Sequence, residues 1–223
     1  MNWIPLILTL KLALVTTLVL FVLAIPLSYW LSITKSKIKP VIETLVSMPL
    51  VLPPTVLGFY LLLAFSPQNV FGAWLENWFG IRLVFSFTGL VLASCIYSLP
   101  FMVQPIQAGL SGISSSLTEA ASLLGKNRLN TLFYILLPNI KSSIITAVVL
   151  TFAHTVGEFG VVLMIGGNIP GKTKVASIAV YDEVESLNYS LANQYSIVLI
   201  ILSFITLFIV YMINGGHLKR FTR

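Results

Sequence analysis

Residues 119–138 read EAASLLGKNRLNTLFYILLP, a stretch that contains several polar residues and lies between long apolar runs. At its start, Ser116 and Glu119 form a Ser-x-x-Glu capping box, in which each side chain can bond one free backbone N–H of a starting helix. Gly125 follows where a left-handed C-terminal cap would lie. Apolar residues at i, i+3, i+4 and i+7 give one stripe on a two-turn helix: Leu117, Ala120, Ala121 and Leu124. The sequence therefore predicts a short amphipathic helix with defined ends.

This short helix needs a surface that covers its apolar stripe. Two turns of helix are only marginally stable alone in water, so burial of the stripe must stabilise them. Either another protein docks on the stripe, or the helix lies in the lipid headgroup region. We expect a protein to dock here, although the residues of the helix alone leave both possibilities open.

The composition of the whole chain indicates an integral membrane protein. Of its 223 residues 57% are hydrophobic and 9% are charged, and the mean hydropathy is +0.96, far outside the range of soluble domains. Four stretches without a charged residue each exceed the roughly 20 residues that cross a bilayer as a helix: 12–34, 44–75, 83–118 and 186–216. A fifth crossing is expected within 133–165, which Lys141, His154 and Glu158 interrupt.

We therefore predict an all-α, polytopic membrane protein, with one domain over residues 1–223 and a cytoplasmic coupling loop at 111–131. The five spans are placed at about 7–33, 44–66, 84–109, 133–165 and 194–214. The fourth is expected to continue as one span through Glu158 to Ile165. A sixth crossing would have to lie in 168–193, where five charged residues oppose it.

Basic residues set the orientation, because positively charged loops stay on the cytoplasmic side. Nine of the thirteen Lys and Arg residues lie after the first span, in the loop before the fourth, or in the C-terminal tail. This places the short helix and the C-terminus in the cytoplasm and the N-terminus outside the inner membrane. The basic clusters flank spans, which indicates anionic lipid rather than nucleic acid. The first span lacks a basic leader and a cleavage pattern, so we expect it to be retained.

One motif that would indicate an ATPase is rejected on its context. Residues 166–173, GGNIPGKT, match the G-x-x-x-x-G-K-[ST] phosphate loop letter for letter. Pro170 removes a backbone N–H where phosphate would be held, and the segment is expected outside, away from ATP. Too few residues follow for the helix and strand of a parallel sheet. We expect no ATPase site, no catalytic set and no cofactor in this chain.

His154 and Glu158 lie one helical turn apart, at a depth where ionisable residues are rare and usually point into the bundle. The order His-x-x-x-Glu lacks the second histidine of a zinc-protease motif and Cys95 is the only cysteine, so no metal site is expected. Glu158 could relay protons, line a solute path or be satisfied by neighbouring helix ends. An ionised Glu158 would repel an anion. We therefore favour a structural or gating role, with Gly157 and Gly160 allowing close helix contact.

The second span contains four helix breakers, within MPLVLPPTVLGF at residues 48–59: Pro49, Pro53, Pro54 and Gly58. A proline frees the carbonyl four residues earlier, and such groups are tolerated at membrane depth only beside protein or a water-lined cavity. The span therefore contains either a path or hinge, or a plain proline kink.

The stretch at 119–138 resembles the EAA loop of permease subunits of binding-protein-dependent ATP-binding-cassette (ABC) importers. The matching residues are Glu119, Ala120, Ala121, Gly125, Ile135, Leu137 and Pro138. Further segments are similar to molybdate permeases, so the resemblance covers nearly the whole chain: 49–62, SLPF at 98–101, GEFG at 157–160, GNIPG at 167–171, Thr173 and AVY at 179–181. Around the GEFG and GNI segments the chain is also similar to sulfate and thiosulfate permeases.

The resemblance implies a type I ABC importer permease that moves molybdate or tungstate across the cytoplasmic membrane. It implies a homodimer, a cytoplasmic ATPase subunit bound to each copy, and an extracytoplasmic oxyanion-binding protein. The residues expected to couple the permease to the ATPase are Glu119, Ala120, Ala121, Gly125 and Pro138. The candidates for lining or gating a path between the two copies are Pro53, Pro54, Thr55, Ser98, Gly157 and Glu158.

Two other functions stay open. A sulfate or thiosulfate permease of the same family would share these motifs, because the binding protein normally sets selectivity. A proton-coupled secondary anion transporter would use Glu158 as its proton carrier and would need no ATPase. The chain has no detectable inverted repeat, which disfavours that second alternative.

Overall fold

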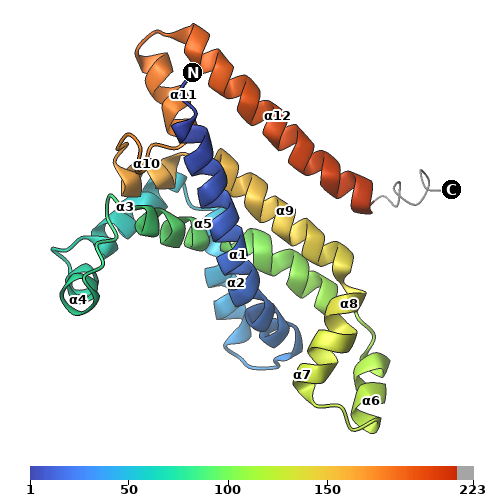
Figure 1. Ribbon diagram of the computed structural model, residues 1–223. Helices are drawn as coiled ribbons and strands as arrows, with labels where there is room; N and C mark the ends of the chain where they lie inside the picture. The colour runs from blue at the N-terminus through green and yellow to red at the C-terminus, as the bar shows by residue number, and fades with distance from the viewer. Residues whose placement is uncertain (215–223) are drawn as a thin grey trace.

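The computed structural model describes residues 1–214, and every regular element in that range is a helix (Figure 1). Three helices are long and apolar enough to cross a membrane: α1 (Ile4–Ile33), α5 (Phe87–Ser111) and α12 (Tyr189–Asn214). Two bent helix pairs raise the number of crossings in these residues to at most five. The prediction of an all-α polytopic membrane fold is confirmed. The end of the predicted cytoplasmic tail, 215–223, lies outside the described residues.

The second predicted span is broken rather than kinked. Helix α2 (Lys39–Ser47) and the short 3-10 helix η1 (Met48–Leu50) are bent by 111° from α3 (Pro54–Phe65). Pro53 has extended backbone and Pro54 is the first residue of α3, a position where proline removes no helical hydrogen bond. The prolines therefore end one helix and start another, so the plain-kink alternative is wrong.

The fourth predicted span is also divided. Helix α9 (Lys141–Gly157) ends before Glu158, whose backbone is extended with ψ 131°, and α10 (Gly160–Gly166) begins after Phe159. The expectation of one unbroken span through Glu158 to Ile165 is wrong. Glycines on both sides of the break weaken the helix there. At its other end α9 is bent by 80° from a segment made of α7 (Arg128–Thr131), the π-helical η2 (Leu132–Leu136) and α8 (Leu137–Asn139).

Three shorter helices lie in the connections between these spans. Helix α6 (Ser115–Leu123) is the short helix predicted in the coupling loop, and α11 (Ala176–Glu185) precedes α12. Helix α4 (Val70–Phe79) lies in the connection from α3 to α5, a segment for which the sequence analysis predicted no helix. Figure 1 places α11 and α6 at opposite ends of the molecule.

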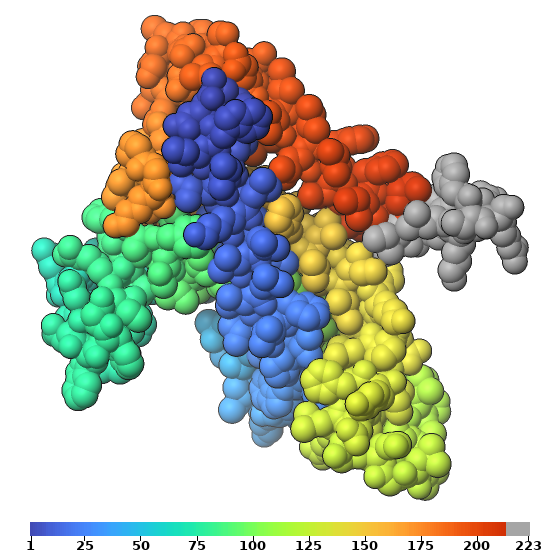
Figure 2. All heavy atoms as spheres, in the orientation of Figure 1, coloured from blue at the N-terminus to red at the C-terminus, as the bar shows by residue number. Residues whose placement is uncertain are grey.

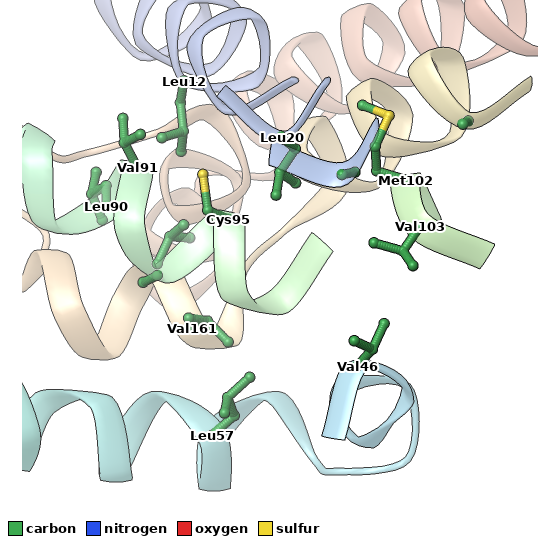
Figure 3. Packing of buried hydrophobic residues seen from close by; sticks show 14 of the residues in the cluster. Leu12, Leu20, Val46, Leu57, Leu90, Val91, Cys95, Met102, Val103 and Val161 are labelled. Carbon is green, nitrogen blue, oxygen red and sulfur yellow. The ribbon is translucent and has the colours of Figure 1, made fainter. Parts of the chain in front are cut away.

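The core lies where α1, α5, α9 and α10 meet. Helix α1 packs along α5, α5 packs along α9, and α10 contacts both α3 and α5. Figure 3 shows side chains from several of these helices turned toward one another, among them Leu12, Leu90 and Val161. Helix α12 contacts α9 and α11 but leans away from the rest of the chain (Figure 2), and most of its apolar surface is uncovered in a single copy.

Candidate functional site

The starts of α3 and α10 pack against one another at what we call the helix junction, residues 53–58 and 157–164. A Cβ added to Gly160 would lie 2.8 Å from Pro54 Cβ and 3.4 Å from the backbone nitrogen of Thr55. One turn further, a Cβ added to Gly58 would lie 2.9 Å from Met164 Cβ. The 2.8 Å and 2.9 Å distances are shorter than ordinary van der Waals contact, so each glycine lets the two helices approach closely.

Two polar contacts join α9 to α5, one helical turn apart. Ser94 Oγ donates to Glu158 Oε2 at 2.7 Å, and Ser98 Oγ lies 2.9 Å from His154 Nδ1. Ser98 also contacts Thr155 Oγ1 at 3.0 Å. Because i and i+4 share one helix face, the pair 94 and 98 on α5 matches the pair 154 and 158 at the end of α9. The sequence analysis singled out His154 and Glu158 but missed Ser94, although the two serines have the same spacing.

Glu158 connects three parts of the fold. Its side chain is 4% exposed, and while Oε2 accepts from Ser94, Oε1 has no partner in the described residues. Its backbone carbonyl, which extended backbone removes from helical bonding, accepts from Ser177 Oγ on α11 at 2.6 Å. A buried polar oxygen without a hydrogen-bond partner costs stability. The geometry fits a brace better than an open solute path.

The structure divides the six path candidates into two groups. Pro53, Pro54, Thr55 and Gly157 are exposed in a single copy at the helix junction. Ser98 is 0% exposed and Glu158 is buried, so both face the interior between helices. The exposed group can border a surface shared with another chain or with water. The buried group lies between helices, away from that surface.

The short helix α6 begins earlier than predicted. Ser114 is its N-cap, with extended backbone and an Oγ that accepts from the Ser116 backbone N–H at 3.3 Å. The prediction of a capping box formed by Ser116 and Glu119 is therefore wrong. Three serines occur in a row at 114–116, and side-chain chemistry alone does not select which of them caps the helix.

The other end of α6 follows the prediction. Gly125 has φ +68°, the left-handed conformation expected of a C-terminal cap. Its N–H donates to the Ser122 carbonyl at 3.0 Å, and the N–H of Lys126 donates to the Ala121 carbonyl at 3.0 Å. These two bonds form a Schellman motif, which satisfies carbonyls that the helix end leaves free.

The apolar stripe of α6 is largely uncovered. Ala121 is 1% exposed, but Leu124 is 77% exposed and the neighbouring Leu123 is 90% exposed. Beside this helix a hollow of about 220 Å³ is lined by Lys126, Asn130, Tyr134 and Ile135. Two further predicted coupling residues, Glu119 and Pro138, are exposed, and Pro138 lies in α8 just before the 80° bend. Exposed leucines beside a hollow are typical of a surface that another molecule covers.

The phosphate-loop look-alike folds onto itself. Thr173 is buried, and its hydroxyl accepts from the Ile169 backbone N–H at 3.0 Å and donates to the Gly166 carbonyl at 2.7 Å. Helix α10 precedes the motif where a phosphate loop would have a strand. The loop is tied to α11, because Asp182 pairs with Lys174 and accepts from Asn168. These contacts hold the segment against α10 and α11, a context that differs from that of a phosphate loop.

A family model described as "Binding-protein-dependent transport system inner membrane component" matches residues 22–223. This chain belongs to that family. It is therefore a multi-pass component of the inner membrane and a transport subunit without an ATPase domain of its own. Membership of a binding-protein-dependent system implies ATPase and binding-protein partners.

Similar proteins agree with this assignment, and similar solved structures agree with the fold. The chain is 46% identical over 205 residues to the molybdenum transport system permease protein ModB of Azotobacter vinelandii, which covers 92% of this chain and 90% of that protein. It is 29% identical over 182 residues to the sulfate transport system permease protein CysT of Escherichia coli, covering 82% and 65%. Its fold matches a chain of the inward-facing MetNI methionine ABC transporter with a TM-score of 0.73 at 17% identity, covering 95% and 94%.

A second solved structure extends the match in fold. A bacterial ABC transporter for the import of alginate gives a TM-score of 0.75 at 19% identity, over 99% of this chain and 79% of that one. The predicted type I ABC importer permease fold is thereby confirmed. At such low identity the two structures show the fold alone.

Proposed function

We propose that this permease carries molybdate, or the nearly isosteric tungstate, into the cell as part of an ATP-driven importer. The observation that carries the proposal is the 46% identity, over nine tenths of the chain, to a permease named for molybdenum transport. A molybdenum permease of Escherichia coli is 38% identical over 148 residues, whereas sulfate permeases of Escherichia coli and Chlorella vulgaris are 29% and 33% identical. Greater similarity to the molybdenum proteins favours the larger tetrahedral dianions.

The ATPase subunit docks on α6 in this proposal. The helix has capped ends and exposed leucines. These are the features expected of a rigid element that fits into a cleft of a partner. Glu119, Ala120, Ala121 and Gly125 belong to the docking surface, and Pro138 lies where α8 passes the motion on to α9. The positive-inside pattern places this surface in the cytoplasm, where ATP is available, and the N-terminus outside.

The solute path lies between two copies of the chain. A single copy leaves most of α12 and the outer side of the helix junction uncovered, and a two-fold dimer is the simplest way to place two such junctions face to face. Pro53, Pro54, Thr55 and Gly157 border the path, and the Thr55 hydroxyl offers weak hydrogen bonding to an oxyanion. Weak binding suffices because a path must release what it binds. Ser98 and Glu158 brace the junction from behind.

The proposal is tested by uptake of radioactive molybdate into vesicles that contain the permease, its ATPase and its binding protein. We expect uptake to require ATP, to be inhibited by tungstate at similar concentrations, and to resist a large excess of sulfate. Equal inhibition by sulfate would instead identify a sulfate permease. Uptake that continues with a catalytically inactive ATPase but stops when the proton gradient collapses would identify a secondary transporter.

A further inference from the structure

Helix α4 is strongly amphipathic although it lies in a connection between spans. At 100° per residue its apolar residues fall within about half of the helix circumference; they are Val70, Phe71, Trp74, Leu75, Trp78 and Phe79. The opposite side carries Gly72, Ala73, Glu76 and Asn77. Such a division is typical of a helix that lies along the boundary between an apolar and an aqueous phase.

The apolar side of α4 is uncovered in this structure. Trp78 is 77% exposed, and Phe71, Trp74 and Phe79 are exposed as well. The rings of Phe71 and Trp74 stack with centroids 6.5 Å apart, and Trp74 meets Phe79 edge-on at 5.4 Å, so they form one continuous aromatic surface. In Figure 1 α4 projects from the body of the molecule beyond α3. An exposed aromatic surface of this size marks an interaction site.

The connections at both ends of α4 hold it at the level of one membrane face. A Cβ on Gly72 would lie 2.1 Å from the Ser66 carbonyl oxygen, so the backbone of α4 abuts the end of α3. Beyond α4 the Phe85 backbone N–H donates to the Ile165 carbonyl at 2.9 Å, which ties the returning chain to α10. The helix therefore lies between the end of one membrane-spanning segment and the start of the next, with little freedom to rise into solution.

The membrane-spanning helix that precedes α4 also exposes apolar side chains. Tyr60 and Leu63 on α3 are exposed, as expected of side chains that face lipid. Tryptophan, with an apolar ring and one N–H donor, is enriched at the membrane–water boundary. On the polar side Arg82, whose side chain is largely exposed, pairs loosely with Glu76 at 3.8 Å and remains able to reach a phosphate group.

We propose that α4 is an interfacial anchor, whose Trp74, Trp78 and Phe79 lie among the headgroups and upper acyl chains of the outer leaflet. The occupant of the aromatic surface is lipid rather than protein. By holding the end of α3 at a fixed depth, the anchor keeps the helix junction at a fixed depth as well. This inference depends on the membrane location of the chain and not on which anion is carried.

Cysteine accessibility tests the anchor in the complete transporter. Cys95, the only native cysteine, is replaced by alanine, and Trp78→Cys or the matched control Asn77→Cys is introduced into separate chains. These neighbours lie on the apolar and the polar side of the same helix. In intact membranes a water-soluble maleimide should modify Asn77→Cys at least about tenfold faster than Trp78→Cys, because a lipid-buried thiol ionises poorly. Both should react equally after denaturation.

A second measurement separates lipid from protein as the cover. A bimane attached at Trp78→Cys should be quenched by lipids that carry a nitroxide near the headgroup, and quenched about twofold less by lipids labelled at the chain end, since the anchor lies only about 5–10 Å deep. Equal and fast maleimide reaction at both positions would overturn the proposal, because α4 would then stand in water. Slow reaction without quenching by either lipid would also overturn it, because protein would then be the cover. Phe79→Cys serves as the apolar-side variant if Trp78→Cys does not assemble.

Discussion

Helix α6 and the helix junction are of similar length but differ in how their backbone polar groups are satisfied. In α6 the backbone is satisfied internally, by the Ser114 cap and the Schellman motif at Gly125, while leucines are left uncovered. At the junction the backbone is broken, and a partly buried side chain from another helix, Ser177, satisfies the Glu158 carbonyl. The first region is complete as a local element and needs a partner. The second is incomplete locally and depends on the rest of the fold.

The largest effect expected is at the end of α6. Replacing Gly125 by valine places a β-branched residue at φ +68°, where the strain is roughly 1–2 kcal/mol and the Schellman motif opens. ATPase activity stimulated by molybdate should fall to background while the chain still inserts, as measured on purified complexes in vesicles. Gly171→Val is the matched control, because Gly171 has φ +73°, likewise has open space around it and lies in the loop before α11. Equal loss in both variants would show that strain anywhere disrupts the protein.

A smaller effect is expected when the α6 surface changes but its shape does not. Leu124→Asp places a charge on the exposed stripe and should weaken ATPase binding about 30-fold, the effect of losing roughly 2 kcal/mol from an interface centre. Titration of the ATPase onto permease in nanodiscs measures this affinity. Leu187→Asp, an equally exposed leucine between α11 and α12, should leave the affinity unchanged. If both variants bind the ATPase as the wild type does, α6 is not the docking surface.

Adding a single methyl group at the helix junction should push α3 and α10 apart. Gly160→Ala directs its Cβ at Pro54, and the cost of about 1–3 kcal/mol should lower the melting temperature by about 5 °C and slow uptake severalfold. Gly157→Ala, three residues away beside open space, should leave the melting temperature unchanged. A stable Gly160→Ala protein with normal uptake would mean that the close approach of the two helices does not matter.

The smallest effect is expected at Glu158, despite its position. Glu158→Gln keeps the shape of the side chain and the hydrogen bond from Ser94, so the pH dependence of uptake should not change. Ser94→Ala should destabilise the protein more than Glu158→Gln does. It leaves the second carboxyl oxygen of Glu158 without a partner, at a cost of about 1–3 kcal/mol. Uptake measured from about pH 5 to about pH 8, the range in which most proteins are most stable, checks both. A proton requirement that disappears in Glu158→Gln would revive the secondary-transporter alternative.

Properties of the local chain could be predicted without coordinates. Charge-free runs identify membrane helices, because hydration of the side chains decides where they can lie. Gly125 ends α6 because only glycine adopts positive φ without strain, and Pro53 and Pro54 break the second span because proline lacks an N–H. The amphipathic spacing of residues 70–79 predicts helix α4 in the same way, because that spacing is a property of the local chain.

Contacts between distant residues needed the three-dimensional structure. Whether Pro53 and Pro54 kink a helix or divide it by 111° depends on α10, which packs against the new helix start through Gly160. Ser94 and Glu158 are 64 positions apart, and Ser177 reaches the Glu158 carbonyl from a third helix. Hydropathy and turn chemistry are properties of neighbouring residues and can be predicted from them. A buried polar group is satisfied by whatever the fold brings beside it, and no single segment of the chain contains that information.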